Sequence, residues 1–538
     1  MRVLLSSVFG PYGVDDAYGR KENIMELFHN QITREQGVFS VRVFHQSFGL
    51  YFIAENIEPP TLVLDFPTQE RFIEEIQKGY DYVGISFIVP NYAKAKHMAE
   101  LVRKHSPGSK IVLGGHGVKI PVVKDTVPHD HLCEGEGVRW FRSLLGEDPD
   151  RSIRHPVVRA SFGGRIMGMP VKDGNAHLCP GVGCPNACRF CCTSHFFHKK
   201  YTPYLETGKD VFDTCLRIEK ELGLTEFFVM DENFLIQRER ALELMDLMEK
   251  NNKFFQFGLF SSADNVVALG PEFLARLGVT KIWIGAESRF EVYEKNKGLD
   301  LKKLLRSLRD HGISVIASAI LFLEQHDKET IWEDIQFAVD LESDFLQFMQ
   351  LGPLPGTQLY EDYDRKGILR TDLPFEEWHG QHRIWFRHPH FTGQESQQFL
   401  KQAFLYDYDQ WGPSVVRMCD TLIRGYRTLK ESCDHFMTRR AEEMRKRAEN
   451  MRVFLEAALA HAHNDRAREI TQVVMEKYEE TLGAMTKRQR RLAEVARKIA
   501  DRESLRLKEG KTVYQPKTIE TAYRMVSETT PVVPVSAT

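Results

Sequence analysis

Residues 183–193, G-C-P-N-A-C-R-F-C-C-T, decide how the rest of this chain is interpreted. They place Cys184, Cys188 and Cys191 in a C-x3-C-x2-C array. The glycine, proline and asparagine of the stretch disfavour regular structure, so we expect a loop that turns back on itself. Such a loop can direct three thiolates to one point, as an iron–sulfur cluster requires. Three ligands for a four-iron cluster leave one iron open to an exogenous chelating ligand.

Zinc is the main alternative for this array. Zinc knuckles use paired C-x2-C or C-x2-C…H-x3-H sets, and no second pair follows at a suitable distance. His195 and His198 are the residues that would have to complete a zinc site, and the spacing rules disfavour it. Unrelated structural thiols seldom crowd so closely in a chain with only 9 cysteines.

The C-x3-C-x-F-C string, with Phe190 before the last cysteine, resembles the cluster loop of the radical S-adenosylmethionine (SAM) enzymes. In that family the amino and carboxylate groups of SAM chelate the open iron. One electron from the [4Fe-4S] cluster then cleaves SAM to a 5′-deoxyadenosyl radical. The resemblance implies that Cys184, Cys188 and Cys191 hold the cluster and that Phe190 contacts SAM.

The totals describe a globular chain of several domains. At 538 residues we expect two or three domains, and 42% hydrophobic with 27% charged residues is a soluble balance. A net charge of −3 gives no reason to expect nucleic acid as a partner. No apolar run is long enough to span a bilayer, and residues 1–13 read as a first strand rather than a signal peptide. Nine cysteines without a disulfide framework predict a cytoplasmic protein.

Residues 1–150 alternate apolar runs with helical patterns. We expect strands at 2–9, 39–45, 82–89 and 110–113, and helices at 71–78 and 93–105. Continuous apolar strands of this kind are typical of a parallel sheet that is covered on both faces. The pattern predicts a doubly wound, Rossmann-like α/β domain with a ligand crevice at the carboxyl ends of its strands.

Three glycine-containing segments of this domain, G-I-S at 84–86, G-G-H at 114–116 and C-E-G-E-G at 133–137, resemble the cobalamin-binding domain that precedes many radical SAM barrels. The resemblance implies cobalamin contacts at six residues: Ser86, Gly114, Gly115, His116, Gly135 and Glu136. The D-x-H-x-x-G string that supplies a histidine to cobalt in the wider class is absent, and nothing places His45 as a ligand. Either the lower cobalt face lacks a histidine, or the domain has lost the cofactor.

Residues 151–177 read as a connector, and 178–365 again repeat strand and helix. Five or six such units suggest a partial (β/α) barrel, whose chemistry gathers at the carboxyl ends of its strands. D-E-N-F (231–234), S-S-A-D (261–264), G-A-E-S (285–288) and P-L-P-G-T (353–357) all fall at such ends. This coincidence predicts a single active site.

Several of these strand ends resemble SAM-contacting segments of the family. By that resemblance Asp231, Glu232, Glu287 and Ser288 position SAM, and a carboxylate suits the task because it accepts hydrogen bonds from two hydroxyls or pairs with an ammonium. Ser261 either holds the SAM carboxylate or belongs to a helix cap. We identify no catalytic acid, base or nucleophile. The loop 324–327, E-Q-H-D, either faces substrate or is a longer turn.

Residues 366–538 show no strand alternation. Residues 366–430 read as an aromatic and histidine-rich helical cap, in which W-H-G-Q-H-R-I-W-F-R-H-P-H-F (378–391) is more typical of packing than of a substrate mouth. Residues 431–525 read as a basic helical subdomain, and 526–538 as a disordered tail. The default for the basic helices is a solvated face; a peripheral membrane contact is the minority alternative.

The sequence therefore predicts an α/β fold with a Rossmann-like cobalamin-binding-type domain, a partial radical SAM barrel and a C-terminal helical region. By resemblance, the cofactors are a [4Fe-4S] cluster, S-adenosylmethionine and cobalamin, and the reaction is methyl transfer to an unactivated carbon of a small-molecule or lipid-like substrate. Flavodoxin or ferredoxin would be the electron donor. Cobalamin-independent cyclisation, rearrangement or carbon–carbon coupling, tRNA methylthiotransfer, and a non-enzymatic iron–sulfur or zinc protein remain as alternatives.

Overall fold

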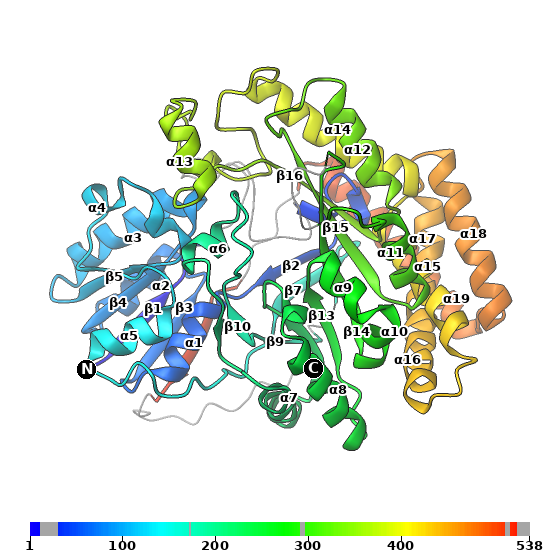
Figure 1. Cartoon of the computed structure of the whole chain (residues 1–538), viewed down its shortest axis with the longest axis horizontal. Helices are drawn as coiled ribbons and strands as arrows, with labels where there is room; N and C mark the ends of the chain where they lie inside the picture. Colours follow the sequence, from blue (N-terminus) through cyan, green and yellow to red (C-terminus); the bar gives the residue numbers. More distant parts are fainter. Residues whose placement is uncertain (11–30, 172–173, 291–295, 512–516, 525–538) are drawn as a thin grey trace.

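Two six-stranded sheets form the centre of the molecule (Figure 1). The structure is a computed structural model that describes residues 1–10, 31–171, 174–290, 296–511 and 517–524. The tail 526–538, which we expected to be disordered, lies outside the described residues. The N-terminal sheet lies to the left in Figure 1, and the second sheet with its helices lies to the right.

The N-terminal sheet has the strand order β17-β3-β1-β4-β5-β6. All neighbouring pairs are parallel except β17 with β3. The parallel strands are β1 (Val3–Ser6), β3 (Thr61–Asp65), β4 (Tyr82–Ser86), β5 (Lys110–Gly114) and β6 (His131–Leu132). This arrangement confirms the expected parallel sheet, whose carboxyl ends meet at one edge.

Helices cover both faces of this sheet, which explains the continuous apolar runs. Side chains of a strand alternate between faces, so Val3 packs with α1 (Phe48–Asn56) and α5 (Gly137–Leu145), whereas Leu4 packs with α2 (Gln69–Ile76) and α3 (Tyr92–His105). A short helix, α4 (Val123–Thr126), follows β5. Because both faces are buried, polar residues are excluded from the strand interiors.

The second strand of the domain differs from the expectation. Residues 39–45 were expected in the parallel sheet, but only β2 (Arg42–His45) is a strand, and it pairs antiparallel with β7 (Ser161–Ile166). With β8 (Met169–Pro170) they form a separate three-stranded sheet. The position beside β1 belongs to β3, T-L-V-L-D, which is buried along its whole length. β2 is half-buried in alternation and therefore suits a sheet with one covered face.

The second sheet has the order β16-β15-β14-β13-β12-β9, entirely parallel. Its strands are β9 (Asn175–Leu178), β12 (Glu226–Val229), β13 (Gln256–Phe260), β14 (Val279–Glu287), β15 (Ser314–Leu321) and β16 (Phe345–Gln350). Between them run α7 (Gly208–Leu222), α8 (Arg238–Lys250), α9 (Ala263–Leu269), α10 (Pro271–Leu277), α11 (Leu301–Asp310) and α12 (Thr330–Asp340). Since β9 and β16 are the two edges, the sheet is an open, partial barrel.

The chain after residue 357 is mainly helical. Its helices are α13 (Gln358–Arg365), α14 (Gly393–Trp411), α15 (Ser414–Leu429), α16 (His435–Met451), α17 (Leu455–Ala460), α18 (Asp465–Leu482) and α19 (Lys487–Lys508). Of these, α14, α15 and α16 pack directly against strands or helices of the barrel. α15 packs against α11 and α16, and α18 packs against α14 and α15. Val474 and Tyr478 of α18 are buried, whereas Val473 is 47% exposed. The apolar residues of this helix are therefore covered by the rest of the protein on one side only.

The last described segment corrects the expectation that 431–525 is helical. β17 (Ile519–Tyr523) adds antiparallel to β3 at the edge of the N-terminal sheet. The Arg71 guanidinium donates two hydrogen bonds to the Glu520 carboxylate, at 2.7 and 2.8 Å. The chain thus returns from the C-terminal helices to the domain in which it began.

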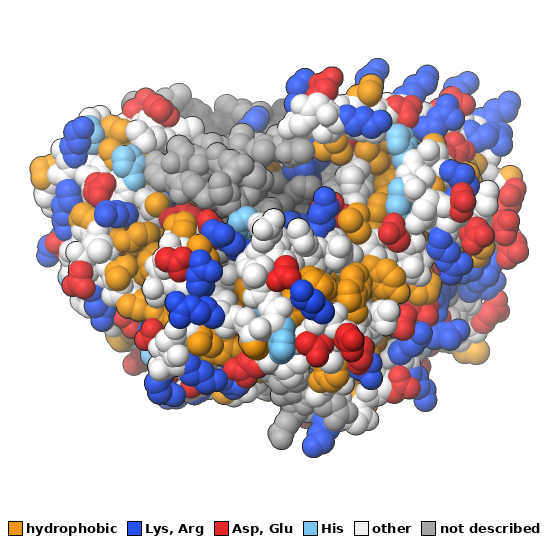
Figure 2. All heavy atoms as spheres, turned by 90° about the horizontal axis from the view of Figure 1, so that it is seen from above, with side chains coloured by type: hydrophobic (Ala, Val, Ile, Leu, Met, Phe, Trp, Pro, Cys, Tyr) orange, Lys and Arg blue, Asp and Glu red, His pale blue; other side chains and the backbone are white. Residues whose placement is uncertain are grey.

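The basic residues of the C-terminal helices are balanced by acidic ones. Arg445 pairs with Glu442 and Glu449 along α16, and Arg506 pairs with Glu503 along α19. Figure 2 shows Lys, Arg, Asp and Glu side chains interspersed on the visible face at this end of the molecule. None of the helices in the described ranges has both the length and the apolar composition needed to cross a bilayer. Peripheral membrane contact stays a prediction.

Candidate active site

The loop that carries the three cysteines lies between two short antiparallel strands, β10 (Gly181–Val182) and β11 (Thr202–Pro203). Gly183 has φ +86°, and a Cβ there would meet the backbone oxygen of Lys200. Only glycine therefore fits this close approach. The chain turns back at this point, and the three cysteines all line one cavity of about 340 Å³.

Hydrogen bonds within the loop hold this turn. The Cys191 N–H donates to the Cys188 carbonyl at 3.0 Å, and the Ser194 hydroxyl donates to the Cys184 carbonyl at 2.6 Å. The Cys191 sulfur accepts from the Ser194 N–H at 3.4 Å at the start of α6 (Cys192–Phe196). Burial raises the pKa of Cys191 to about 12, so a bound cation is needed to hold this sulfur as a thiolate.

The two histidines of the zinc alternative have other neighbours. His195 Nδ1 lies 3.0 Å from the Cys191 carbonyl. His198 lies against the N-terminal domain, where a Cβ on Gly135 would be 3.5 Å from its Nε2. In the described part of the chain no group of three or more His, Cys, Asp or Glu side chains is arranged around a point as a single metal ion needs. The three thiols instead border a cavity, as a larger cluster needs.

At the end of β14, Glu287 and Ser288 of the G-A-E-S segment have different surroundings. Glu287 has φ +60°, is 6% exposed and lines the cysteine cavity. Ser288 does not line it; its hydroxyl donates to the Asp334 carboxylate of α12 at 2.6 Å. His326 Nε2 approaches the same carboxylate at 2.8 Å and is fully buried, so the loop 324–327 is a structural turn at this residue.

In the D-E-N-F segment after β12, too, only some of the residues line the cysteine cavity. Asp231 accepts hydrogen bonds from Arg240 Nη2 at 2.8 Å and from the Tyr201 hydroxyl at 2.7 Å, and it is 1% exposed. It therefore belongs to a buried ion pair and does not line the cavity. Glu232 and Asn233 do line it. Asn233 Oδ1 accepts from the Ser261 hydroxyl at 2.8 Å, which connects two strand ends.

Asn233 was not singled out in the sequence, although it stands in a quoted motif. Its carboxamide also accepts from the Ser262 N–H at 3.1 Å and donates to the Ser262 hydroxyl at 3.1 Å. These bonds fix Ser261 and Ser262 at the cavity wall. The helix-cap alternative for Ser261 is wrong, because the residue at the N-cap of α9 is Ser262 and no side-chain hydrogen bond caps that helix. An amide in a polar segment directly after an expected barrel strand is the signal that could have indicated it.

Aromatic side chains form much of the remaining wall. Phe260 and Trp283 are stacked, with ring centroids 5.1 Å apart, and Phe190 and Trp385 also line the cavity. Trp378 and Trp385 both come from the aromatic and histidine-rich stretch and are both buried in the core of the N-terminal domain, but only Trp385 borders the cavity. That stretch is therefore mainly packing, as expected, but it contributes one wall of the site.

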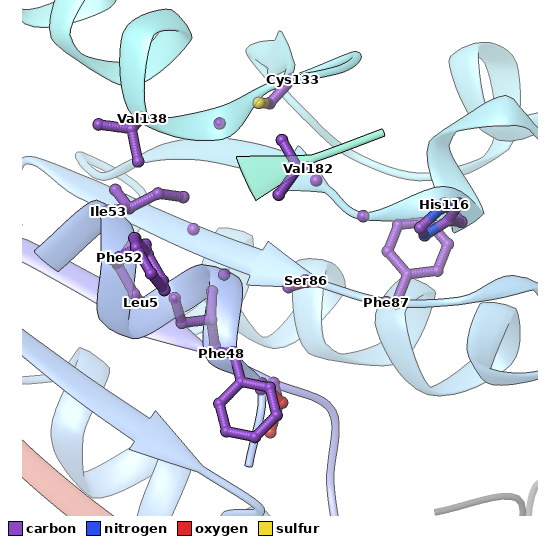
Figure 3. Close-up of a pocket in the computed structure, with 18 of the residues that line it drawn as sticks. Leu5, Phe48, Phe52, Ile53, Ser86, Phe87, His116, Cys133, Val138 and Val182 are labelled. Atoms are coloured by element: carbon purple, nitrogen blue, oxygen red, sulfur yellow. The ribbon is translucent and has the colours of Figure 1, made fainter. Parts of the chain in front are cut away.

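A second cavity, of about 490 Å³, lies at the carboxyl ends of the strands of the N-terminal sheet (Figure 3). All six residues that resemble cobalamin contacts line it: Ser86, Gly114, Gly115, His116, Gly135 and Glu136. Its deep part is apolar, and Figure 3 shows Leu5, Phe52, Ile53 and Val138 gathered on one side of it. Gly115 has φ +82°, and a Cβ there would lie 2.5 Å from the Phe87 carbonyl, so the turn can be made only by glycine.

Two polar residues of this second cavity differ in their hydrogen bonding. Glu136 caps α5: its carboxylate accepts from the N–H groups of Val138 and Arg139 at 2.8 Å, and from the Tyr204 hydroxyl at 2.7 Å. His116 Nε2 is buried without a hydrogen-bond partner among the described residues. Burial lowers the pKa of His116 to about 4, so its ring is neutral.

The two cavities meet at Glu232, the one described residue that lines both. Its side chain has exposed surface, although many protein atoms lie around it. Desolvation of the carboxylate by these atoms, and then the neighbouring Asp231 carboxylate, raise the pKa of Glu232 to about 7, while a hydrogen bond from Thr193 acts in the opposite direction. A molecule placed beside Glu232 can thus reach both cavities.

Comparison with known families identifies the barrel. The family model described as the Radical SAM superfamily matches residues 178–338, which run from the end of β9 into α12 and include the three cysteines. Residues 178–338 thus match a radical SAM domain, which confirms the resemblance read from the cysteine loop. The match indicates an enzyme.

Curated relatives match more of the chain at low identity. Bacteriochlorophyllide d C-8(2)-methyltransferase of Chlorobaculum tepidum is 24% identical over 378 residues, which cover 64% of this chain and 80% of the relative. Anaerobic magnesium-protoporphyrin IX monomethyl ester cyclase of Rubrivivax gelatinosus is 22% identical over 330 residues, which cover 53% of this chain and 59% of the relative.

One solved structure extends the likeness in fold beyond the barrel. The radical S-adenosylmethionine methyltransferase TsrM of Kitasatospora setae, with cobalamin and a [4Fe-4S] cluster bound, superposes with a TM-score of 0.51 at 16% identity. The match covers 84% of this chain and 99% of TsrM. The likeness shows a shared fold that extends well outside residues 178–338.

Proposed function

We propose that this chain is a cobalamin-dependent radical SAM methyltransferase that acts on an unactivated carbon of a small molecule. The observation that carries the proposal is the junction at Glu232. Methyl transfer of this kind needs a substrate within reach of both a SAM site and a corrin, and here the cysteine cavity and the glycine-lined cavity share a residue. The TsrM likeness, whose fold holds both cofactors, supports the same arrangement.

The residues of the first cavity fit a cluster and SAM. Cys184, Cys188 and Cys191 would hold a [4Fe-4S] cluster, which supplies the electron for SAM cleavage when it is bound. Glu287 and Ser261, both nearly buried, would orient SAM by accepting from its hydroxyl or ammonium groups and donating to its carboxylate. Asn233 positions Ser261, and Trp385 helps to exclude water from the site.

The second cavity fits a corrin with a nucleotide tail. Three of its glycines provide a backbone that a large planar group can approach, and its deep part is apolar. Cobalamin, when bound, would supply a methyl carrier beside the radical site.

Electron supply is a further part of the proposal. The cluster needs a low-potential one-electron donor, for which reduced flavodoxin or ferredoxin are suitable by their chemistry. Omitting such a donor, with no chemical reductant present, should abolish SAM cleavage by the loaded protein.

Metal content tests the proposal directly. The protein would be purified anaerobically from cells supplied with hydroxocobalamin, and iron and cobalt would be measured per chain. We expect about four iron and about one cobalt, with release of 5′-deoxyadenosine from SAM after reduction. Iron with 5′-deoxyadenosine but no cobalt would reject methyl transfer from cobalamin and favour cyclisation, rearrangement or coupling. Absence of SAM cleavage would contradict every radical mechanism.

A further inference from the structure

The segment that follows α6 carries basic residues on the surface beside the cysteine loop. His198, Lys199 and Lys200 are all exposed. Neither lysine forms an ion pair with a residue that the structure describes. In the cysteine loop itself, Pro185 and Asn186 are exposed as well. The loop is thus close to the outside of the protein, and a partner that approaches this segment comes close to the loop.

Two hydrogen bonds connect a cluster cysteine to this segment. The Ser194 N–H donates to the Cys191 sulfur at 3.4 Å, and the Ser194 carbonyl accepts from the Lys199 N–H at 2.7 Å. At the start of the loop, a Cβ added to Gly183 would meet the carbonyl oxygen of Lys200. One residue and two hydrogen bonds therefore separate a ligand sulfur from the main chain of an exposed lysine.

The backbone of the segment has an uncommon conformation. His198 and Lys199 are consecutive non-glycine residues with φ of +57° and +58°. Left-handed φ is unfavourable for residues that carry a Cβ, and it persists where the surrounding structure holds it. Here the bond to Ser194 holds Lys199, and the Lys200 N–H donates to the Phe197 carbonyl at 3.1 Å. The turn thus keeps the main chain of both lysines beside the cysteine loop.

Further cations lie around this segment. Lys119 pairs with Glu134 at 2.5 Å. The hydrogen bond from Lys119 lowers the pKa of Glu134, and the nearby charges of Lys124 and His198 act in the same direction. We call the four lysines of this surface the loop-side lysines: Lys119, Lys124, Lys199 and Lys200. Only Lys119 among them has an ion-pair partner in the described ranges, so the surface carries an excess of positive charge.

The cation within the cysteine loop is balanced, in contrast to these lysines. Arg189 is 50% exposed and lies 3.1 Å from the Asp362 carboxylate and 3.9 Å from that of Glu324. Its charge is therefore matched by acidic side chains of the same chain. The uncompensated positive charge near the cluster cysteines lies on the side of the loop-side lysines.

We propose that the loop-side lysines are the docking surface for a small acidic protein that delivers one electron to the cluster. Electron transfer slows steeply with distance, so such a carrier must dock close to the cysteine loop. Opposite charge on the two surfaces speeds their encounter and orients them. With a flavin carrier, one electron leaves the hydroquinone, which becomes the semiquinone, and the oxidised cluster gains that electron. The inference rests on the proposed function for the cluster alone and does not require cobalamin.

The test follows reduction of the iron-loaded protein by flavodoxin hydroquinone, and separately by reduced ferredoxin, in an anaerobic stopped-flow instrument without SAM. Lys199→Glu/Lys200→Glu reverses two charges of the surface. At low ionic strength we expect its second-order rate constant to fall by about tenfold or more, because attraction becomes repulsion. Added salt should slow reduction of the wild type but not of this variant, because salt screens the attraction.

Two matched variants control for charge and for damage to the loop. Lys487→Glu/Arg488→Glu makes the same change in net charge at an exposed pair on α19, which lies far from α6 in Figure 1. It should be reduced within about twofold of the wild-type rate, since distant charges are screened. Lys199→Arg/Lys200→Arg keeps both charges and should match the wild type. Iron content and the extent of photoreduction with 5-deazaflavin verify an intact cluster in each variant.

Three results would overturn the docking surface. The first is equal slowing by the two double-glutamate variants, which would show long-range repulsion. The second is a wild-type cluster that photoreduced deazaflavin reduces and that neither acidic carrier reduces. The third is binding of phosphatidylglycerol vesicles through these lysines while the carriers reduce every variant alike, which would assign the surface to anionic lipid. A protein without a reducible iron cluster would instead refute the proposed function, and one without cobalt would leave this inference standing.

Discussion

At the scale of single residues, neighbours in the sequence carry different tasks at the ends of the barrel strands. Asp231 is bound to Arg240 inside the protein, while Glu232 faces both cavities. Glu287 faces the cysteine cavity, while Ser288 is bound to Asp334. Successive side chains of an extended segment point to opposite sides, so a motif of adjacent polar residues delivers only part of itself to a site.

The Asp231–Arg240 pair leads to a stability prediction. Asp231→Asn leaves the Arg240 cation buried without its counter-charge, and both side chains are at most 2% exposed. We expect the free energy of unfolding to fall by about 3–5 kcal/mol, measured by urea denaturation at neutral pH. Asp246→Asn, an exposed position on α8, should change it by less than about 0.5 kcal/mol. Equal effects of the two substitutions would contradict the ion-pair role.

The cysteine loop leads to a prediction about iron. Replacing Cys184, Cys188 or Cys191 by Ala should remove the bound iron and abolish SAM cleavage, because a cluster held by three thiolates is not retained by two. Cys192→Ala is the control, since Cys192 adjoins the array but does not line the cavity. The iron content and the 5′-deoxyadenosine released from SAM would be measured for each variant. Iron retained in Cys188→Ala and lost in Cys192→Ala would show that the proposed ligand set is wrong.

At the scale of elements, there is a physical reason why residues 39–45 do not join the parallel sheet in which they were expected. β2 alternates buried and half-buried residues, and β3 is buried throughout. A central position beside β1 requires two apolar faces, so β3 takes it. Its outer edge is then covered by β17, which comes from the far end of the chain.

The β17–β3 pairing predicts a local change in backbone protection. Thr521→Pro places a residue without an N–H in the middle of β17, opposite Val63. We expect amide exchange of residues 61–65 to accelerate by about tenfold or more, measured by hydrogen–deuterium exchange. Thr521→Ala keeps the N–H and should leave exchange in β3 nearly unchanged. If neither variant alters exchange there, β17 does not protect the edge of the sheet.

At the scale of the whole molecule, histidines at the junction of the two sheets affect how stability varies with pH. Burial lowers the pKa values of His45, His116 and His155 from 6.5 to about 4, 4 and 3. The unfolded chain therefore binds protons at a higher pH than the folded chain. Stability is full above pH 6.5 and declines as the pH falls from there toward the folded-state values.

This linkage predicts a steep loss of stability in mild acid. At about pH 5 the cost is on the order of 2 kcal/mol for each of these histidines. Asp65, whose pKa burial raises, offsets part of the loss, because its folded form takes up a proton more readily. Urea denaturation of the cofactor-free protein between pH 7.5 and 5 checks the sign. A free energy of unfolding that rises toward pH 5 would contradict it.

The sequence by itself determined the cluster loop, most barrel strands and their helices, and the identity of the family. These features depend on local spacing: thiols a few residues apart, and apolar runs whose period sets strand or helix. Only the tertiary structure decided that β3 replaces β2, that β17 closes the sheet, and that Asn233 and Trp385 border the cysteine cavity. Those outcomes depend on which way a side chain points and on what packs against it from remote segments, and neither is encoded in the spacing of neighbours.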